Sequence, residues 1–135
     1  MDVARWTGGW QRLLTEDRPR SATLVAVVAD EVVGFVDVVP ARDDATPDTG
    51  EVTSIYVLPS AWVTGAGRGL MAAAVDRMRS DGFRAATLWV LRDNERARRF
   101  YERAGWSVDG TEKDDVAAGR TVTEVRYRRS LRDSS

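Results

Sequence analysis

A short glycine-containing segment is the first candidate for chemistry, because its glycines stand directly before a helical pattern. Gly65, Gly67 and Gly69 precede residues 70–79, in which apolar residues recur at helical spacing. The first backbone N–H groups of a helix have no partner inside it and lie at the positive end of the helix dipole, so they attract phosphate. Glycine lets an anion approach these groups because it has no Cβ. The segment is typical of a phosphate-binding loop, with a tight strand-to-helix turn as an equal alternative.

Few types of side chain are available for acid–base chemistry, because the chain contains no histidine and no cysteine. This composition excludes the commonest general base at neutral pH, thiol nucleophiles and thiolate metal sites. Carboxylates, tyrosine or water must therefore move any protons. The glycine segment has neither the Lys-Ser/Thr pair of a Walker loop nor the spacing of a dinucleotide fingerprint, so we expect neither type of nucleotide site.

The glycine segment needs a strand before it and a helix after it. Residues 51–58 are rich in β-branched and aromatic side chains and predict a strand that ends at Pro59. Two β-branched runs farther upstream predict a hairpin, and strand–helix alternation follows, so the order predicts an α/β fold with a mixed sheet. The remaining expected elements are a marginal helix over 2–16, hairpin strands over 21–29 and 31–39, a strand over 85–91, a helix capped by Asp93 or Asn94 and ended by Gly105, a turn over 113–119, a strand over 121–128 and a frayed tail over 130–135.

Two motifs in this order resemble the GCN5-related N-acetyltransferase (GNAT) family. Trp62-x-x-Gly65-x-Gly67, preceded by Ile55-Tyr56-Val57-x-Pro59, is similar to the family's acetyl-CoA pyrophosphate loop, whose usual form is Gln/Arg-x-x-Gly-x-Gly/Ala. The segment from Asn94 to Trp106 looks like the family's asparagine-to-tyrosine helix. The resemblance covers residues 22–129 and implies a GNAT-like, mostly antiparallel twisted sheet flanked by helices, in a single domain spanning residues 1–135.

The chain departs from the family pattern in two places. Trp62 stands where arginine or glutamine is usual, which puts any side-chain contact from this position in doubt. The strand and helix that the family places before the position of Asp2 are also missing, and they normally form one wall of the amine site. Either the chain is truncated or another subunit fills that space.

The resemblance implies that acetyl-CoA is the co-substrate and that no metal takes part. Backbone groups of Ile55, Tyr56 and Val57 would contact the pantetheine arm, with the N–H of Val57 facing the thioester oxygen. Asn94 would hydrogen-bond the pantetheine and Tyr101 would donate a proton to the coenzyme thiolate; the alternatives are a helix cap and a core position. The loop residues expected to bind the pyrophosphate are Val63, Thr64, Gly65, Ala66, Gly67 and Arg68. Four arginines of this helix could contact coenzyme phosphates, with a solvated surface as the alternative: Arg96, Arg98, Arg99 and Arg103.

Glu51 is the candidate general base. It lies four residues before Ile55, and side chains alternate along a strand with period two, so we expect both side chains on one face. The carboxylate would then lie in line with the reacting end of the coenzyme and take a proton directly or through one water. In several family members a glutamate here is the base. The alternative is a solvated carboxylate at the start of a strand.

Composition narrows the function classes further. The net charge is −1, which disfavours a nucleic-acid partner. No segment is apolar enough to span a membrane, and the first residues lack the charged and apolar regions of a signal peptide, so we expect a cytoplasmic protein without one. The predicted function is transfer of an acetyl group to a primary amine of a small molecule or peptide, by direct attack in a ternary complex. A coenzyme-A-binding module without turnover is the alternative, and a homodimer is a candidate assembly because dimers are common in the family.

Overall fold

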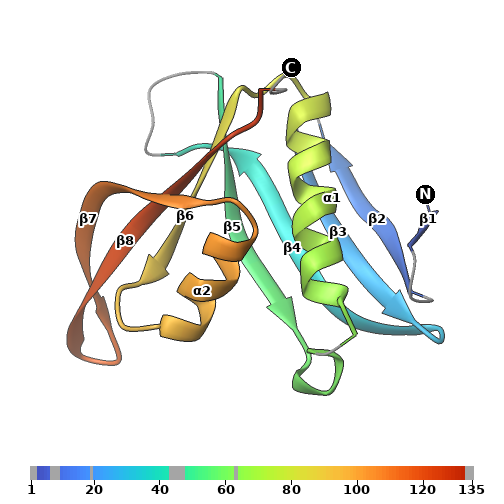
Figure 1. Cartoon of the computed structure of the whole chain (residues 1–135), viewed down its shortest axis with the longest axis horizontal. Helices are drawn as coiled ribbons and strands as arrows, with labels where there is room; N and C mark the ends of the chain where they lie inside the picture. The colour runs from blue at the N-terminus through green and yellow to red at the C-terminus, as the bar shows by residue number, and fades with distance from the viewer. Residues whose placement is uncertain (1–2, 7–9, 19, 43–47, 63, 133–135) are drawn as a thin grey trace.

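An eight-stranded sheet is the main element of the computed structural model. The structure describes residues 3–6, 10–18, 20–42, 48–62 and 64–132, with the backbone alone for 3–6 and 10–18. The strand order is β1-β2-β3-β4-β5-β6-β8-β7, and only β5 and β6 run parallel (Figure 1). The predicted mixed, mostly antiparallel sheet is therefore confirmed. The strands are β1 (Val3–Trp6), β2 (Trp10–Arg18), β3 (Ser21–Val28), β4 (Glu31–Pro40), β5 (Thr49–Val57), β6 (Ala85–Leu91), β7 (Ser107–Ala117) and β8 (Arg120–Ser130).

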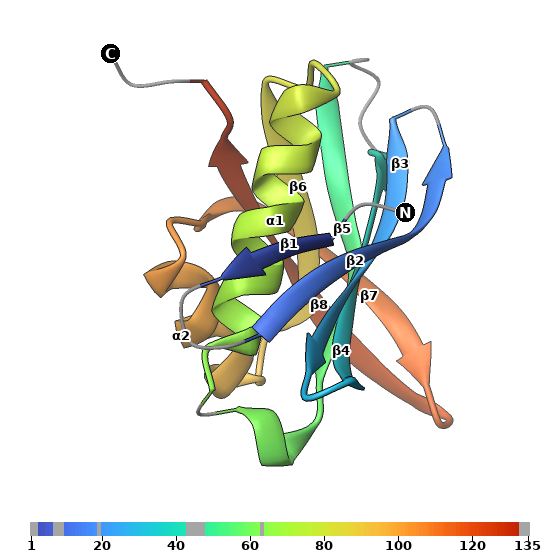
Figure 2. The same ribbon diagram turned by 90° about the vertical axis from the view of Figure 1, so that its right-hand side faces the viewer.

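Two α-helices lie on one face of this sheet (Figure 2). They are α1 (Ala66–Ser80) and α2 (Glu95–Arg103), and a 3₁₀ turn, η1 (Pro59–Ala61), leads from β5 toward α1. The apolar stripe of α1 is buried as its spacing predicts, and Leu70 and Met78 are fully covered. Burying a side chain of this size contributes roughly 1.5–3 kcal/mol, so this stripe fixes α1 on the sheet. Neither described helix is long and apolar enough to cross a membrane.

The sequence signals at the ends of β6 and α2 are confirmed. β6 has the predicted bounds, and the Asn94 side chain accepts a 3.1 Å hydrogen bond from the Ala97 amide at the start of α2. Gly105 follows the C-cap of α2 with φ 94°, a left-handed conformation that glycine adopts without strain. Local capping chemistry therefore sets both ends of this helix.

The predictions about the chain start and the last hairpin are wrong, and the predicted frayed tail is wrong for residues 130 and 131. Residues 3–6 and 10–18 form strands and not the marginal helix, because β2 pairs along β3 and such pairing outweighs a weak helical pattern. The turn predicted over 113–119 is mostly strand, since β7 continues to Ala117. The tail is ordered through Leu131, which is buried and donates a 2.8 Å hydrogen bond to the Arg84 carbonyl; residues 133–135 lie outside the described residues.

The parallel strands β5 and β6 separate along their length. Their register joins only residues 49–52 to residues 85–88, although β5 continues to Val57 and β6 to Leu91. The strands diverge toward the end where α2 lies (Figure 1). This divergence removes one hydrogen-bonding neighbour from the second half of β5 and positions the candidate site.

Candidate functional site

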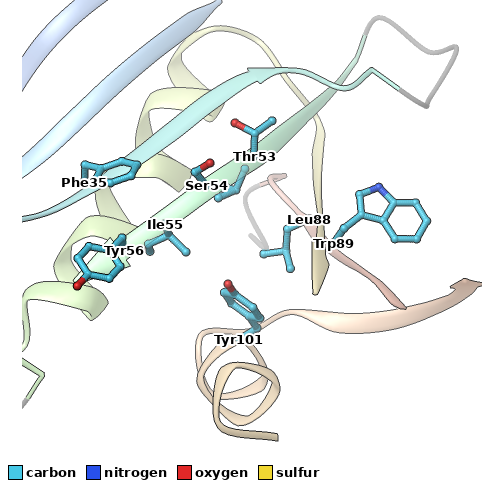
Figure 3. Close-up of a pocket in the computed structure, with 9 residues that line it drawn as sticks. Phe35, Thr53, Ser54, Ile55, Tyr56, Leu88, Trp89 and Tyr101 are labelled. Carbon is cyan, nitrogen blue, oxygen red and sulfur yellow. The ribbon is translucent and has the colours of Figure 1, made fainter. Parts of the chain in front are cut away.

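A cavity lies where β5 and β6 separate. Its volume is about 310 Å³, and its lining comes from β4, β5, β6 and α2 (Figure 3). The residues that line it are Phe35, Val52, Thr53, Ser54, Ile55, Tyr56, Leu88, Trp89 and Tyr101. Ile55, Tyr56 and Tyr101, three of the predicted site residues, are thus brought together from two elements that are distant in the sequence.

On the side of the opening, the second half of β5 has backbone N–H groups without a partner among the described residues. Leu58 donates its N–H to the Val33 carbonyl at 2.8 Å, on the β4 side. Successive backbone groups of a strand point to opposite edges, so the N–H groups of Ile55 and Val57 point away from β4 and toward the gap. An extended amide-containing chain could therefore pair with this edge as an additional strand does. This geometry agrees with the contacts expected of residues 55 and 57.

Tyr101 points into the same opening from α2. The side chain is 9% exposed, and its hydroxyl has no hydrogen-bond partner among the described residues. In Figure 3 the hydroxyl is directed at the space between Ile55 and Leu88. Burial raises the pKa of Tyr101 above its ordinary value of 10.0, so the hydroxyl keeps its proton well beyond neutral pH. Tyr101 thus presents a protonated hydroxyl donor to the cavity.

The glycine segment forms the first turn of α1. Gly65 is the N-cap with φ 87°, and a Cβ placed there would meet no atom within 4 Å. The N–H groups of Gly67 and Arg68 have no acceptor in the part of the chain that the structure describes, as expected at a helix N-terminus. Arg68 is exposed. The predicted phosphate geometry, outward amides with open space before them, is present.

Of two other predicted loop residues, the structure describes Thr64 but not Val63. The Thr64 hydroxyl donates a 2.6 Å hydrogen bond to the Ala61 carbonyl and accepts a 3.3 Å bond from the Ala66 amide. These bonds stabilise the conformation of the loop between η1 and α1. Val63 lies outside the described residues.

Asn94 lies at the end of the site and not in the cavity lining. It is the exposed N-cap of α2 and has non-helical dihedral angles, so the helical spacing that placed it beside Tyr101 does not apply. Its side-chain oxygen is bonded to the Ala97 amide, which leaves the side-chain NH₂ as a donor for a ligand. The two alternatives predicted for Asn94, cap and ligand contact, are therefore compatible.

The expected placement of Glu51 beside Ile55 is wrong. The pairing of β4 with β5 shifts between Asp37↔Ser54 and Val38↔Val52, so Thr53 is an extra residue. Such a bulge inverts the alternation of side chains beyond it. Glu51 consequently lies on the face of Ser54 and Tyr56, opposite α1.

The Glu51 carboxylate is also engaged by a neighbour. Its side chain is 3% exposed, and it accepts three hydrogen bonds from Arg42, of which the guanidinium Nη2 bond is 3.0 Å. Arg42 is 70% exposed, so the pair is open to solvent on one side. The carboxylate thus anchors the segment after β4 on the central strand.

Sequence reasoning missed two polar groupings around α2. Tyr127 donates a 2.7 Å hydrogen bond to Glu102 and accepts a 2.9 Å bond from Arg98, which ties α2 to β8. Trp62 donates its indole N–H to the Val57 carbonyl at 2.9 Å and carries the Arg96 guanidinium over its ring. Only the departure from the family motif at Trp62 pointed to the second grouping, because Arg96 is distant from Trp62 in the sequence.

The chain is similar to known acetyltransferases. The family model described as the acetyltransferase (GNAT) family matches residues 2–106. A mycothiol acetyltransferase of Propionibacterium freudenreichii is 40% identical over 84 residues, which are 62% of this chain and 27% of that protein. An uncharacterized N-acetyltransferase of Mycobacterium bovis is 31% identical over 93 residues, which are 69% of this chain and 57% of that protein. The chain thus spans less than two thirds of these relatives.

Solved structures share the fold. A structure from Desulfovibrio desulfuricans, described as belonging to the GNAT family, superposes with a TM-score of 0.69 at 29% identity and covers 83% of this chain and 70% of that one. The YncA protein of Salmonella typhimurium, solved with its cofactor acetyl-CoA, gives a TM-score of 0.73 at 22% identity and covers 85% of this chain and 67% of that one.

Proposed function

The chain belongs to the GNAT family of acetyltransferases, and from that premise we propose that it transfers an acetyl group from acetyl-CoA to a primary amine by direct attack. The hydroxyl of the largely buried Tyr101, which has no partner among the described residues and is aimed into the opening between β5 and β6, carries the proposal. Such a group has no structural use in the described residues, whereas a departing thiolate needs a proton donor at this kind of position.

The residues present fit the coenzyme in two respects. Amide groups of Gly65, Gly67 and Arg68 would bind the pyrophosphate, helped by the positive end of α1. Val63, Thr64 and Ala66 would flank it, with the Ala66 amide bonded to the Thr64 hydroxyl. The unpaired edge of β5 would bind the pantetheine arm through Ile55 and Val57, beside the Tyr56 side chain, and the Asn94 NH₂ group would add a donor. Bound acetyl-CoA supplies the thioester that is attacked.

Residues of the chain then orient the acyl group and move the protons. The Val57 N–H would donate to the thioester oxygen as negative charge develops on it. The amine nitrogen forms a bond to the carbonyl carbon, the carbon–sulfur bond breaks, and Tyr101 gives its proton to the sulfur. Glu51 would accept the amine proton through water, from the face opposite α1. No covalent acyl-enzyme is expected, because the chain has no cysteine and no activated serine at the matched positions.

The test pairs turnover with binding. Acetyl-CoA consumption would be measured with polyamines, aminoglycosides, amino acids and short peptides, and acetyl-CoA affinity by calorimetry on the same preparation. Binding together with turnover of at least one amine supports the proposal. Failure of acetyl-CoA to bind overturns it, and binding without turnover of any amine favours the coenzyme-A-binding module instead.

A further inference from the structure

Trp62 connects the end of β5 to the start of α2. Its indole N–H donates a 2.9 Å hydrogen bond to the Val57 carbonyl, and its ring centroid lies 3.3 Å from the guanidinium carbon of Arg96. An arginine over an indole face is an attractive cation–π contact. The contact limits the positions available to the Arg96 side chain, which otherwise would be free to rotate in solvent.

A second contact joins α2 to the first turn of α1. A Cβ at Gly67 would lie 3.5 Å from the Phe100 ring, so this turn packs against α2. Arg96 and Phe100 are four residues apart in α2 and share one face of that helix. Trp62 itself precedes the N-cap Gly65 by three residues. The face of α2 that carries Arg96 and Phe100 therefore lies next to the end of α1 where the amide N–H groups are exposed.

The charge of Arg96 is not neutralised by a carboxylate of the described residues. Two neighbours on α2 are engaged elsewhere: Arg99 lies 3.9 Å from the Glu95 carboxylate, and Arg98 donates to the Tyr127 hydroxyl and to the Arg92 carbonyl. Arg96 is held by an aromatic ring, which orients a guanidinium without cancelling its charge. An oriented, uncompensated guanidinium next to helix N–H groups suits a phosphate ester.

We propose that Arg96 recognises the phosphates of the coenzyme and that Trp62 is the positioning residue that holds it there. The inference rests on the proposed function and extends it, because it assigns selectivity for a phosphorylated acyl carrier over an unphosphorylated pantetheine thioester. It also gives Trp62 a role at the position where the family usually has arginine or glutamine: the cation comes from α2 instead of the loop.

Calorimetry on the full chain with two probes tests this assignment. Acetyl-CoA carries the phosphates, whereas acetyl-pantetheine has the same thioester arm without them. Loss of one charge-assisted contact should lower acetyl-CoA affinity of Arg96→Gln about tenfold, with acetyl-pantetheine affinity unchanged. Trp62→Leu should show the same selective loss, and Trp62→Phe, which keeps a ring for Arg96, should recover most of it. Arg99→Gln is the matched control and should bind both probes as wild type does.

The outcomes separate this inference from the proposed function. If wild type binds acetyl-CoA and Arg96→Gln binds it equally well, or loses affinity for both probes equally, the assignment of Arg96 is overturned while the function stands. If Trp62→Phe is as weak as Trp62→Leu, the ring is not what positions Arg96. A wild-type chain that binds no acetyl-CoA overturns the proposed function itself.

Discussion

Replacement of Tyr101 by phenylalanine removes one hydroxyl from the candidate site. General acid catalysis typically contributes about 10²–10⁴-fold in rate, which corresponds to about 3–5 kcal/mol of barrier. The hydroxyl has no partner among the described residues, so its loss leaves no buried group unpaired, and the free energy of unfolding should change by less than about 1 kcal/mol. Tyr101→Phe should therefore lower kcat at least 10²-fold and leave acetyl-CoA affinity within a few-fold.

Tyr127 provides a matched control, since its ring lies 6.0 Å from that of Tyr101 and the same atom can be removed. Its hydroxyl bonds both Glu102 and Arg98. Tyr127→Phe should cost about 1–2 kcal/mol of stability because it breaks these bonds, with little change in kcat. The two variants should thus show opposite effects on rate and stability.

The assay is release of the coenzyme thiol with the best amine of the panel, alongside chemical unfolding and acetyl-CoA calorimetry of each variant. An unchanged kcat in Tyr101→Phe would remove Tyr101 from its role as acid. A large loss of coenzyme affinity with a proportionate loss of rate would show that the hydroxyl binds the coenzyme and does not donate the proton.

Three further predictions concern the pH dependence set by Tyr101, the glycine segment and Glu51. Burial raises the pKa of Tyr101 and its protonated form is the active one, so kcat should show no decline from this group as pH rises until pH exceeds about 10; a basic limb with a midpoint below pH 9 would contradict the assignment. Gly65→Val should abolish acetyl-CoA binding measured calorimetrically, because its side chain would enter the space before the α1 amides, whereas Gly82→Val, also at positive φ (91°) with no atom within 4 Å, should be similarly strained but bind normally. Glu51→Gln should lower kcat about tenfold or more if the carboxylate accepts the amine proton, whereas Arg42→Gln, which leaves that carboxylate in place, should not; equal rates in the two variants would exclude Glu51 as the base.

The sequence predicts those parts of the fold that depend on local chemistry. The hairpin of β3 and β4, the bounds of β6, the Asn94 cap and the Gly105 stop all follow from residues within a few positions of one another. The strand–loop–helix order around Gly65 follows from the same signals. The buried stripe of α1 is also correct, because helical periodicity is long and regular there.

The misses involve contacts between distant residues. The bulge at Thr53 depends on the register of β4 against β5, and no residue type in the sequence indicates it. The bulge places the Glu51 side chain on the face opposite to the expected one. The strands over residues 3–18 exist through pairing with β3, which outweighs a weak helical pattern. The Trp62–Arg96 contact likewise requires the packing of α2 against α1 to be known first.

The central claim is that the coenzyme lies in the gap between β5 and β6 with its phosphates on the first turn of α1. An amide-resolved NMR titration with acetyl-CoA tests it most directly. The account predicts that the largest shift changes occur at the amides of Gly65, Gly67 and Arg68 and at those of Ile55 and Val57. Saturable changes confined to another face of the sheet, with these five amides unmoved, would contradict it.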